Sequence, residues 1–221
     1  MVPSRQNAKE EASDTRQKLL AAAIEAFGRR GFDGTSIRDV AKAAGVNIAG
    51  IAYHFGGKEQ LYRACLDHIT EKVRAGLSHH LGLEVAHSSA SAREALKDAL
   101  YGMTRFILAT PEVASFIRVV VREQMDPSPA FDILYEKFME PMHRRLCVLW
   151  ANATGGDPES EESKIAVFSL LGQVLLFRIA RAGALRRMGW REIGERELKA
   201  LKHQISASID LLAQSSEMHR R

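Results

Sequence analysis

Apolar residues recur three and four positions apart along most of the chain. Residues with that spacing share one face of an α-helix, whereas a half-buried strand alternates apolar and polar residues. Alternating runs of Val, Ile and Thr closed by Asn-Gly or Asp-Gly turns are absent from the sequence, apart from a lone Asp33-Gly34. The pattern therefore predicts an all-α protein of about nine helices.

The first predicted helix covers residues 14–30, after a polar stretch over 1–13 in which we expect a disordered tail. Gly31 is expected to end this helix, because glycine readily adopts the left-handed conformation found at helix C-termini. The inner face of the helix is formed by Leu20, Ile24 and Phe27.

The second predicted helix has the clearest boundaries. Ser36 is expected to cap its N-terminus, with Asp39 reaching back to complete a capping box. Gly45 closes the helix. Its apolar stripe comprises Ile37, Val40, Ala41 and Ala44, at positions i, i+3, i+4 and i+7.

A very short third helix is expected over about 48–54, after a turn that begins at Gly45. Such a short helix is not stable alone, but it suits a probe that the first two helices hold in place. Two helices joined by a short turn form a helix-turn-helix, whose second helix enters the major groove of DNA. We interpret residues 14–57 as a DNA-binding domain.

Further helices are expected after Gly56-Gly57. The first is a connecting helix over 58–82, and the second domain, 83–221, holds the rest. Residues 79–91, rich in His, Ser and Gly, are interpreted as the connection between domains. The remaining helices are predicted at about 91–109, 112–125, 128–153, 159–184 and 194–214.

The composition is that of an ordinary globular protein with positive charge gathered near the N-terminus. Apolar residues make up 46% of the 221 residues and charged residues 26%, so a sizeable core can be buried. The net charge is +4, and residues 1–58 hold 9 Lys/Arg against 6 Asp/Glu, which gives +3 of that total. This excess suits a polyanionic partner and predicts a clear but not extreme salt dependence.

The sequence gives no sign of export or membrane insertion. The N-terminal residues lack the apolar stretch of a signal peptide, and no apolar run approaches the roughly 18 residues that span a bilayer. Cys65 and Cys147 lie far apart, which favours a reducing cytoplasm over a disulfide framework or a zinc site. We expect a cytoplasmic protein without membrane contact, metal or cofactor.

An ordered set of residues between Thr15 and about Ile69 resembles the TetR family of transcription regulators. The matching residues are Ala22, Phe27, Gly31-Phe32, Thr35-Ser36-Ile37-Arg38-Asp39-Val40-Ala41, Ala44-Gly45-Val46, Tyr53-His54-Phe55, Lys58-Glu59 and Leu61. The resemblance implies a homodimer that binds a double-stranded DNA operator and responds to an unknown small-molecule effector.

The C-terminal half is similar to a narrower group, the CecR-type regulators, which are linked to control of drug-sensitivity and transport genes. The matching stretches are Asn47-Ile48-Ala49, Arg122-Glu123-Gln124, Pro141-Met142-His143, Phe177-Arg178 and Gly189-Trp190. A repressor released by the effector is the favoured function, and an activator or a regulator controlled by a protein partner is the alternative. A helical enzyme is a distant third, because the sequence holds no Ser/His/Asp order and no Gly-rich phosphate loop.

Polar and cationic side chains cluster where a groove-bound third helix would leave the DNA: Tyr53, His54 and Lys58. Phosphate oxygens accept hydrogen bonds from such groups and from the free N–H groups of a helix N-terminus. We interpret the three residues as phosphate contacts, with packing of Tyr53 against the first helix as the alternative. Ala52 stands where many family members carry Tyr, so Tyr53 is expected to take over that contact.

The start of the second helix is expected to grip the flanking DNA backbone through Thr35, Ser36 and Arg38. A capping role for Ser36 is compatible with this contact. Gly57 stands where Ser or Asn usually caps the fourth helix in the family, at a cost of only a few tenths of a kcal/mol.

The tip of the third helix carries few polar side chains. Asn47 either contacts adenine or caps the helix, and Ile48 either touches a thymine methyl group or belongs to the core. Ala49 and Gly50 are expected to permit close approach to the bases. DNA shape is therefore expected to share in the readout.

A ligand pocket is expected in the second domain. Its predicted residues are Met103, Phe106, Arg118, Arg122, Glu123, Phe131, His143, Gln173, Phe177 and Arg178. Ordinary core packing is the alternative for any one of the apolar members. Because buried charges need partners, Arg122 or Arg178 either pairs with Glu123 as a structural lock, the favoured reading, or meets an anionic ligand.

Two apolar stripes predict a dimer interface. They comprise Phe168, Leu171, Leu175 and Ile179 on one helix, and Leu201, Ile205, Ile209 and Leu212 on the last. Two such helices from each of two subunits form a four-helix interface, and two DNA half-sites require two subunits. The alternative is that both stripes face their own subunit.

Overall fold

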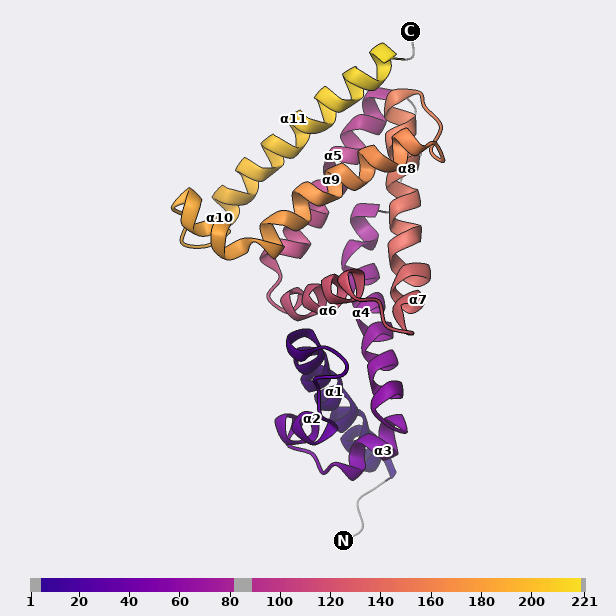
Figure 1. Cartoon of the computed structure of the whole chain (residues 1–221), viewed down its shortest axis with the longest axis vertical. Helices are drawn as coiled ribbons and strands as arrows, with labels where there is room; N and C mark the ends of the chain where they lie inside the picture. Colours follow the sequence, from indigo (N-terminus) through magenta and orange to yellow (C-terminus); the bar gives the residue numbers. More distant parts are fainter. Residues whose placement is uncertain (1–4, 82–88, 220–221) are drawn as a thin grey trace. The chain divides into compact units, whose positions relative to one another are not determined.

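The computed structural model describes residues 5–81 and 89–219, and the regular structure in these ranges is helical (Figure 1). Packing divides the chain into two compact units. The first comprises the residues up to Lys72 together with Ser115–Tyr135, and the second comprises Val73–Ala114 and the residues from Glu136 onward. We expected a sequential division at residues 57 and 83, whereas the packed units interleave along the chain.

Eleven α-helices occur in the described ranges: α1 (Arg5–Arg30), α2 (Ile37–Ala44), α3 (Ala49–Phe55), α4 (Lys58–Leu81), α5 (Ser89–Ala109), α6 (Val113–Met125), α7 (Phe131–Leu134), α8 (Glu140–Thr154), α9 (Glu161–Ile179), α10 (Arg181–Met188) and α11 (Glu195–His219). A π-helical turn, Tyr135–Met139, joins α7 to α8. The all-α prediction is confirmed. The expected nine helices become eleven, because two of the predicted helices are each divided.

The predicted helix over 128–153 is divided at the π-helical turn. Pro141 lies in the first turn of α8. A proline has no N–H group and its ring crowds the carbonyl four residues earlier, so the α-helical hydrogen-bond pattern cannot continue through that point. The predicted helix over 159–184 is divided at Ala180, where the chain bends by 81° between α9 and α10.

Helix α1 begins at Arg5, nine residues before the expected start at residue 14. The expected disordered tail over 1–13 is therefore wrong for residues 5–13, while residues 1–4 lie outside the described residues. Residues 5–13 contain Arg, Gln, Lys, Glu and Ala, which are good helix formers, and no Gly or Pro. Most of the predicted connection at 79–91, residues 82–88, also lies outside the described residues.

The helix-turn-helix of the first unit packs around α1. Helices α1, α2 and α3 contact one another pairwise (Figure 1). The predicted inner face of α1 is confirmed, since Leu20, Ile24 and Phe27 are buried. On α2, Val40 and Ala41 are buried and the other two stripe residues are half-buried. Helix α3 is short and buries only Ile51, and it contacts both α1 and α2. This agrees with a helix that its neighbours hold in place.

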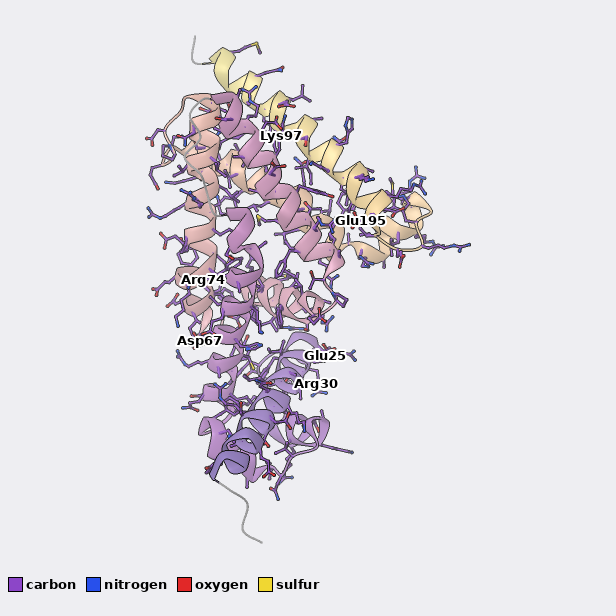
Figure 2. The ribbon with its side chains drawn as sticks, turned by 180° about the vertical axis from the view of Figure 1, so that it is seen from behind. Glu25, Arg30, Asp67, Arg74, Lys97 and Glu195 are labelled. Atoms are coloured by element: carbon purple, nitrogen blue, oxygen red, sulfur yellow. The ribbon has the colours of Figure 1, made fainter. Side chains whose placement is uncertain are left out.

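The second unit is built on α5, α8, α9 and α11, which pack on one another (Figure 1). Leu100 of α5, Trp150 of α8, Leu170 of α9 and Ile209 of α11 lie in its core. In the described residues, three ion pairs also join α5 to α11: Lys97 Nζ lies 2.9 Å from Asp210 Oδ1, Arg105 Nη1 lies 2.8 Å from Glu195 Oε1, and Lys202 Nζ lies 3.9 Å from Asp98 Oδ1 (Figure 2 labels Lys97 and Glu195).

The side chains and helices of the described ranges bear on the broad class of protein. In residues 5–81 and 89–219, no group of three or more His, Cys, Asp or Glu side chains is arranged to hold a metal ion. In the same ranges no single helix combines the length and apolar character needed to cross a bilayer, and α9 with α10 meets that test only as a pair bent by 81°.

Candidate nucleic-acid interface

The two helices of the helix-turn-helix are fixed at their ends by local hydrogen bonds. Ser36 Oγ accepts a hydrogen bond from the Arg38 N–H (3.2 Å), and Gly45 ends α2 in the left-handed conformation (φ 67°). The expected capping box is only half formed, because in the described structure the Asp39 carboxylate pairs with Arg30 (3.7 Å) instead of reaching back. Ser36 and Arg38 remain exposed, as phosphate contacts require.

Thr35 does not fit its predicted role as a side-chain phosphate contact. Its side chain is only 2% exposed, and its hydroxyl lies 2.7 Å from the Gly31 carbonyl oxygen and 3.2 Å from that of Ala26. These carbonyl groups lie at the C-terminus of α1 and after it, where the helix leaves its last acceptors unpaired. Thr35 therefore joins α1 to α2, and its hydroxyl is not available to DNA.

The residues at the start of α3 bear on two of the alternatives. Asn47 Oδ1 accepts a hydrogen bond from the Ala49 N–H (2.9 Å), so the capping role of Asn47 is realised. Its contact with adenine, through the amide nitrogen, stays a prediction. Ile48 is 40% exposed, so the core alternative is wrong and the thymine contact stays open. Ala49 is also exposed.

The packing around Gly50 gives a reason for glycine at this position that we did not predict. A Cβ atom at this position would lie 2.9 Å from Val46 Cγ1, which is closer than such carbon atoms approach. The glycine therefore faces the turn between α2 and α3, where the two segments pack too tightly for a side chain. The expectation that Gly50 mainly permits approach to the bases is corrected accordingly.

Tyr53 is the most exposed aromatic residue at the C-terminal end of α3. Its side chain is 83% exposed, and its ring meets the edge of the His54 ring at a centroid distance of 4.9 Å. Packing of Tyr53 against the first helix is therefore wrong. A large exposed aromatic residue with a hydroxyl group is suited to a phosphate oxygen.

Lys58, at the first turn of α4, is held by its neighbours in a fixed place. Its Nζ lies 4.6 Å above the centroid of the Phe32 ring and donates to the Asp33 carbonyl oxygen (3.4 Å). Gly57 precedes it at φ 151°, a conformation that side chains rarely adopt, which explains glycine in place of the usual Ser or Asn cap. Lys58 begins α4, whose first N–H groups lack partners within the helix.

Helix α6 contributes residues to the DNA-binding unit instead of to a pocket in the second unit. Arg118, expected in the ligand pocket, forms an ion pair with Glu25 of α1 (Figure 2 labels Glu25). Arg122 Nη2 donates to the Arg29 carbonyl oxygen (3.4 Å). Both arginines are exposed, and α6 comes close enough to α1 that a Cβ on Gly28 would lie 3.3 Å from Arg118 Cβ.

Glu123 is a buried carboxylate with hydrogen bonds from two directions. It is 2% exposed and accepts a hydrogen bond from the Tyr62 hydroxyl of α4. Its other oxygen accepts from the Ser128 N–H (3.2 Å) and hydroxyl (3.0 Å). A structural lock was expected here, but its partners are Tyr62 and Ser128 instead of an arginine. Burial, and then the Glu123 carboxylate, raise the pKa of Tyr62.

The predicted pocket residues therefore separate into two groups. Arg118, Arg122, Glu123 and Phe131 lie in the first unit, where the Phe131 ring is 6.0 Å from that of Tyr135. The second unit holds the remaining six: Met103, Phe106, His143, Gln173, Phe177 and Arg178. A pocket formed by all ten is not supported, and one formed by the second group stays a prediction.

Within the second unit, the His143 side chain of α8 contacts α9. Its ring is 4.1 Å from the Phe168 ring, and its Nδ1 is 3.6 Å from Cys147 Sγ. Burial lowers the pKa of His143. Farther along α9, the Phe177 ring stacks on Trp190 at 6.4 Å, so both aromatic residues have a packing role.

Only part of the predicted dimer stripes is exposed and able to contact a second copy. Leu201, Ile205 and Ile209 of α11, with Leu171 of α9, are buried in their own chain, because both helices use these faces to pack on α5 and α8. For these four residues the prediction is wrong. The exposed apolar face of α9 comprises Ile165, Phe168, Leu176 and Ile179. Leu175 and Leu212 are half-buried.

Tyr62, Ser128 and Glu25 were missed as site residues. Tyr62 falls on the apolar stripe of α4, so its spacing marks it as core and gives no sign of its hydroxyl partner. The second partner of Glu123 lies five residues away, beyond the helix. Glu25 and Arg118 are 93 residues apart. None of these pairings leaves a signal in one sequence.

These features define a DNA-binding protein of the helix-turn-helix class with a helical second unit. Residues 19–65 match the family of bacterial regulatory proteins named tetR, and residues 92–214 match the C-terminal domain of the HTH-type transcriptional dual regulator CecR. CecR of Shigella flexneri is 32% identical over 205 residues, which covers 90% of this chain and 91% of that protein. The chain belongs to the TetR family of transcriptional regulators, with a CecR-type C-terminal domain, and is not an enzyme.

Solved structures have the same fold. A TetR-like regulator from Rhodococcus sp. RHA1 gives a TM-score of 0.64 at 20% identity, over 88% of this chain and 93% of that one. AibR, crystallised with isovaleryl coenzyme A and operator DNA, also gives 0.64, at 15% identity over 87% and 96%. At these identities the likeness concerns the fold alone.

Proposed function

We propose that the protein is a dimeric repressor that leaves its operator when a small molecule binds, acting in the cytoplasm, where bacterial DNA lies. The observation that carries the proposal is that one chain has both an exposed probe helix, α3, and an exposed apolar face on α9. One probe reads one half-site, so a regulator of this class needs a second copy. The face on α9 is the surface that a second copy would cover.

The DNA contacts are assigned to side chains of the first unit, of which Tyr53, Ser36 and Arg38 are exposed and His54 and Lys58 are half-buried. Tyr53, His54 and Lys58 would hold the phosphates on one side of the probe helix, and Ser36 with Arg38 would hold them on the other. Asn47, Ile48 and Ala49 would face the bases. Because only Asn47 among these three offers a polar side chain, direct readout is sparse, and DNA shape would supply much of the specificity.

The dimer would form through α9. Ile165, Phe168, Leu176 and Ile179 are spaced by three, eight and three residues, so they lie on one side of the helix. Exposed apolar stripes of this length are rare on monomers and mark interaction sites. A second copy packed on the same face, related by a two-fold axis, would bury them in both chains.

The effector would bind in the second unit. Met103, Phe106 and Phe177 are apolar and His143, Gln173 and Arg178 are polar, which is the usual mixture in a ligand site. AibR holds a coenzyme A thioester together with operator DNA in this fold, which supports a small-molecule site. Effector binding would lower operator affinity by a coupling energy of typically about 1–3 kcal/mol.

The test begins by selecting duplexes from a random library with the purified full-length protein. We expect an enriched palindromic duplex that binds two chains, as measured by mass photometry. A thermal-shift screen of small molecules, repeated with that duplex, then identifies compounds that stabilise the protein and weaken its DNA binding. Failure to enrich any duplex would contradict the DNA-binding proposal, and binding of one chain per duplex would contradict the dimer.

Repression has its own test. The Shigella relative is named a dual regulator, which favours activation as the second candidate. In vitro transcription from a promoter that carries the selected site should decrease when the protein is added and recover with the effector. Increased transcription would replace the repressor by an activator while leaving the DNA-binding proposal intact.

A further inference from the structure

A continuous set of contacts leads from the DNA-facing end of α4 into the interior of the first unit. The Lys58 ammonium lies 4.6 Å above the Phe32 ring, and the Phe32 ring lies 5.2 Å from the Tyr62 ring. The Tyr62 hydroxyl donates to the Glu123 carboxylate. Each link is a direct contact between neighbouring groups, and all four residues belong to the first unit.

Glu123 is the fixed point of this set. A buried carboxylate is costly unless its oxygens accept hydrogen bonds, and here one oxygen accepts from Tyr62 and the other from Ser128. Moving either donor away would leave part of a buried charge unsatisfied. The carboxylate therefore ties the position of α4 to the position of the turn that follows α6.

That turn belongs to the segment Ser115–Tyr135. The segment packs with the DNA-binding unit, yet the chain enters it from Ala114 and leaves it at Glu136, both of which belong to the second unit. The segment is therefore joined covalently to the second unit at both of its ends. Within the segment, Glu123 accepts a hydrogen bond from Tyr62 of α4, and Ser128 donates to the other oxygen of Glu123.

We propose that Glu123 is a positioning residue for DNA binding, which acts through Tyr62 and Phe32 to set the Lys58 ammonium for a phosphate. The proposal rests on the proposed phosphate contact of Lys58 and deepens the account of effector control. When Ser115–Tyr135 shifts, the Tyr62 hydroxyl loses its acceptor, the aromatic contact to Phe32 loosens, and the Lys58 side chain loses its fixed place. DNA affinity then falls although no DNA-contacting residue has been displaced by a ligand.

The test is a double-mutant cycle on operator affinity, measured by fluorescence anisotropy at several salt concentrations with the selected duplex. The variants are Tyr62→Phe, Lys58→Ala and the two combined. Tyr62→Phe should lower affinity about fivefold or more, the usual size of coupling between sites. It should also reduce the salt dependence by about one phosphate contact, as Lys58→Ala does, and add nothing further in the Lys58→Ala background.

Tyr101→Phe is the matched control. The Tyr101 hydroxyl, on α5, lies 3.5 Å from Arg105 Nη1 in the second unit and outside the contact set. Its removal should change neither the affinity nor the salt dependence. Phe32→Leu breaks the middle of the set without touching the buried carboxylate, and it should reproduce the reduced salt dependence even where Tyr62→Phe lowers the yield of folded protein.

Additive losses with an unchanged salt dependence in both Tyr62→Phe and Phe32→Leu would overturn the inference, because a purely structural role weakens binding equally in every background. Loss of affinity in Tyr101→Phe equal to that in Tyr62→Phe would overturn it as well. Unchanged affinity and salt dependence in Lys58→Ala alone would instead show that Lys58 does not contact a phosphate, which would contradict the proposed function on which the inference rests.

Discussion

The Thr35 hydroxyl lies 2.7 Å from the carbonyl oxygen of Gly31, at the joint between α1 and α2. Thr35→Val keeps the shape of the side chain but leaves two carbonyl groups without this donor. We expect the free energy of unfolding to fall by about 1–3 kcal/mol, the usual cost of an unsatisfied buried polar group. Urea denaturation at fixed protein concentration measures it, and operator affinity per folded molecule should be unchanged. A large loss of affinity with unaltered stability would return Thr35 to the DNA contacts.

Gly50→Ala should destabilise the turn between α2 and α3. The added methyl group would lie 2.9 Å from Val46 Cγ1, so one of the two segments must shift. Overpacking of this kind costs about 1–3 kcal/mol. The double variant Gly50→Ala with Val46→Ala removes the clash and should recover both the melting temperature and operator binding. If the double variant binds DNA no better than Gly50→Ala, the small residue is needed at the DNA surface itself.

Tyr53→Phe should weaken DNA binding by about tenfold or more, since a hydrogen bond to a charged group is worth about 1.5–3 kcal/mol. Because the partner would be a phosphate, the loss should be equal for the selected duplex and for a scrambled duplex. Fluorescence anisotropy with both duplexes gives the comparison. A loss confined to the selected duplex would make Tyr53 a base-reading residue.

Phe168→Asp should prevent dimer formation through α9. Phe168 is 64% exposed in the single chain, and a carboxylate in the middle of a buried apolar interface has no partner. Analytical ultracentrifugation should report a monomer, with operator affinity reduced because only one probe helix binds. Met125→Asp is the control, since Met125 is 82% exposed and belongs to α6 of the first unit. A dimer that persists in Phe168→Asp would place the interface elsewhere.

Acid should destabilise the protein through two histidines. Burial lowers the pKa of His68 and of His143, so each binds fewer protons in the folded chain than in the unfolded chain, where the value is about 6.5. Stability contributed by the neutral rings is complete above that value and is lost as the pH falls below it. Urea denaturation at pH 7.5 and 5.5 should show a loss that is smaller in His143→Asn. An equal loss in both proteins would mean that His143 is not responsible.

The helix-turn-helix was predictable because its signals are local. Ser36 and Gly45 bound α2 through hydrogen bonds within a few residues, so the sequence indicates them directly. Thr35 and Gly50 were misassigned because residue type alone does not say whether a small polar or small side chain faces DNA or a neighbouring helix. The contact that decides the role of each residue is made with a neighbour only four residues away, Gly31 for Thr35 and Val46 for Gly50. That neighbour lies within the protein and not at the DNA-facing surface.

The second unit was less predictable for a different reason. Spacing along α11 indicates an apolar stripe correctly, yet it does not say whether Ile205 and Ile209 face their own chain or another copy. Arg118 and Glu123 were placed in a pocket because charged residues within an apolar helix suggest ligand binding. Their partners, Glu25 and Tyr62, are contributed by segments more than 60 residues away in sequence, and pairing over that separation depends on the fold.

The interleaved first unit also constrains how regulators of this kind exchange domains. A chimera joined in the segment between the two family matches, after residue 65 and before residue 92, would take its helix-turn-helix from one parent and Ser115–Tyr135 from the other. Tyr62 would then meet a foreign α6 that need not carry an acceptor at position 123. Transplanting Ser115–Tyr135 together with the N-terminal helices keeps the donor and acceptor from one parent, so a working exchange requires three crossovers instead of one.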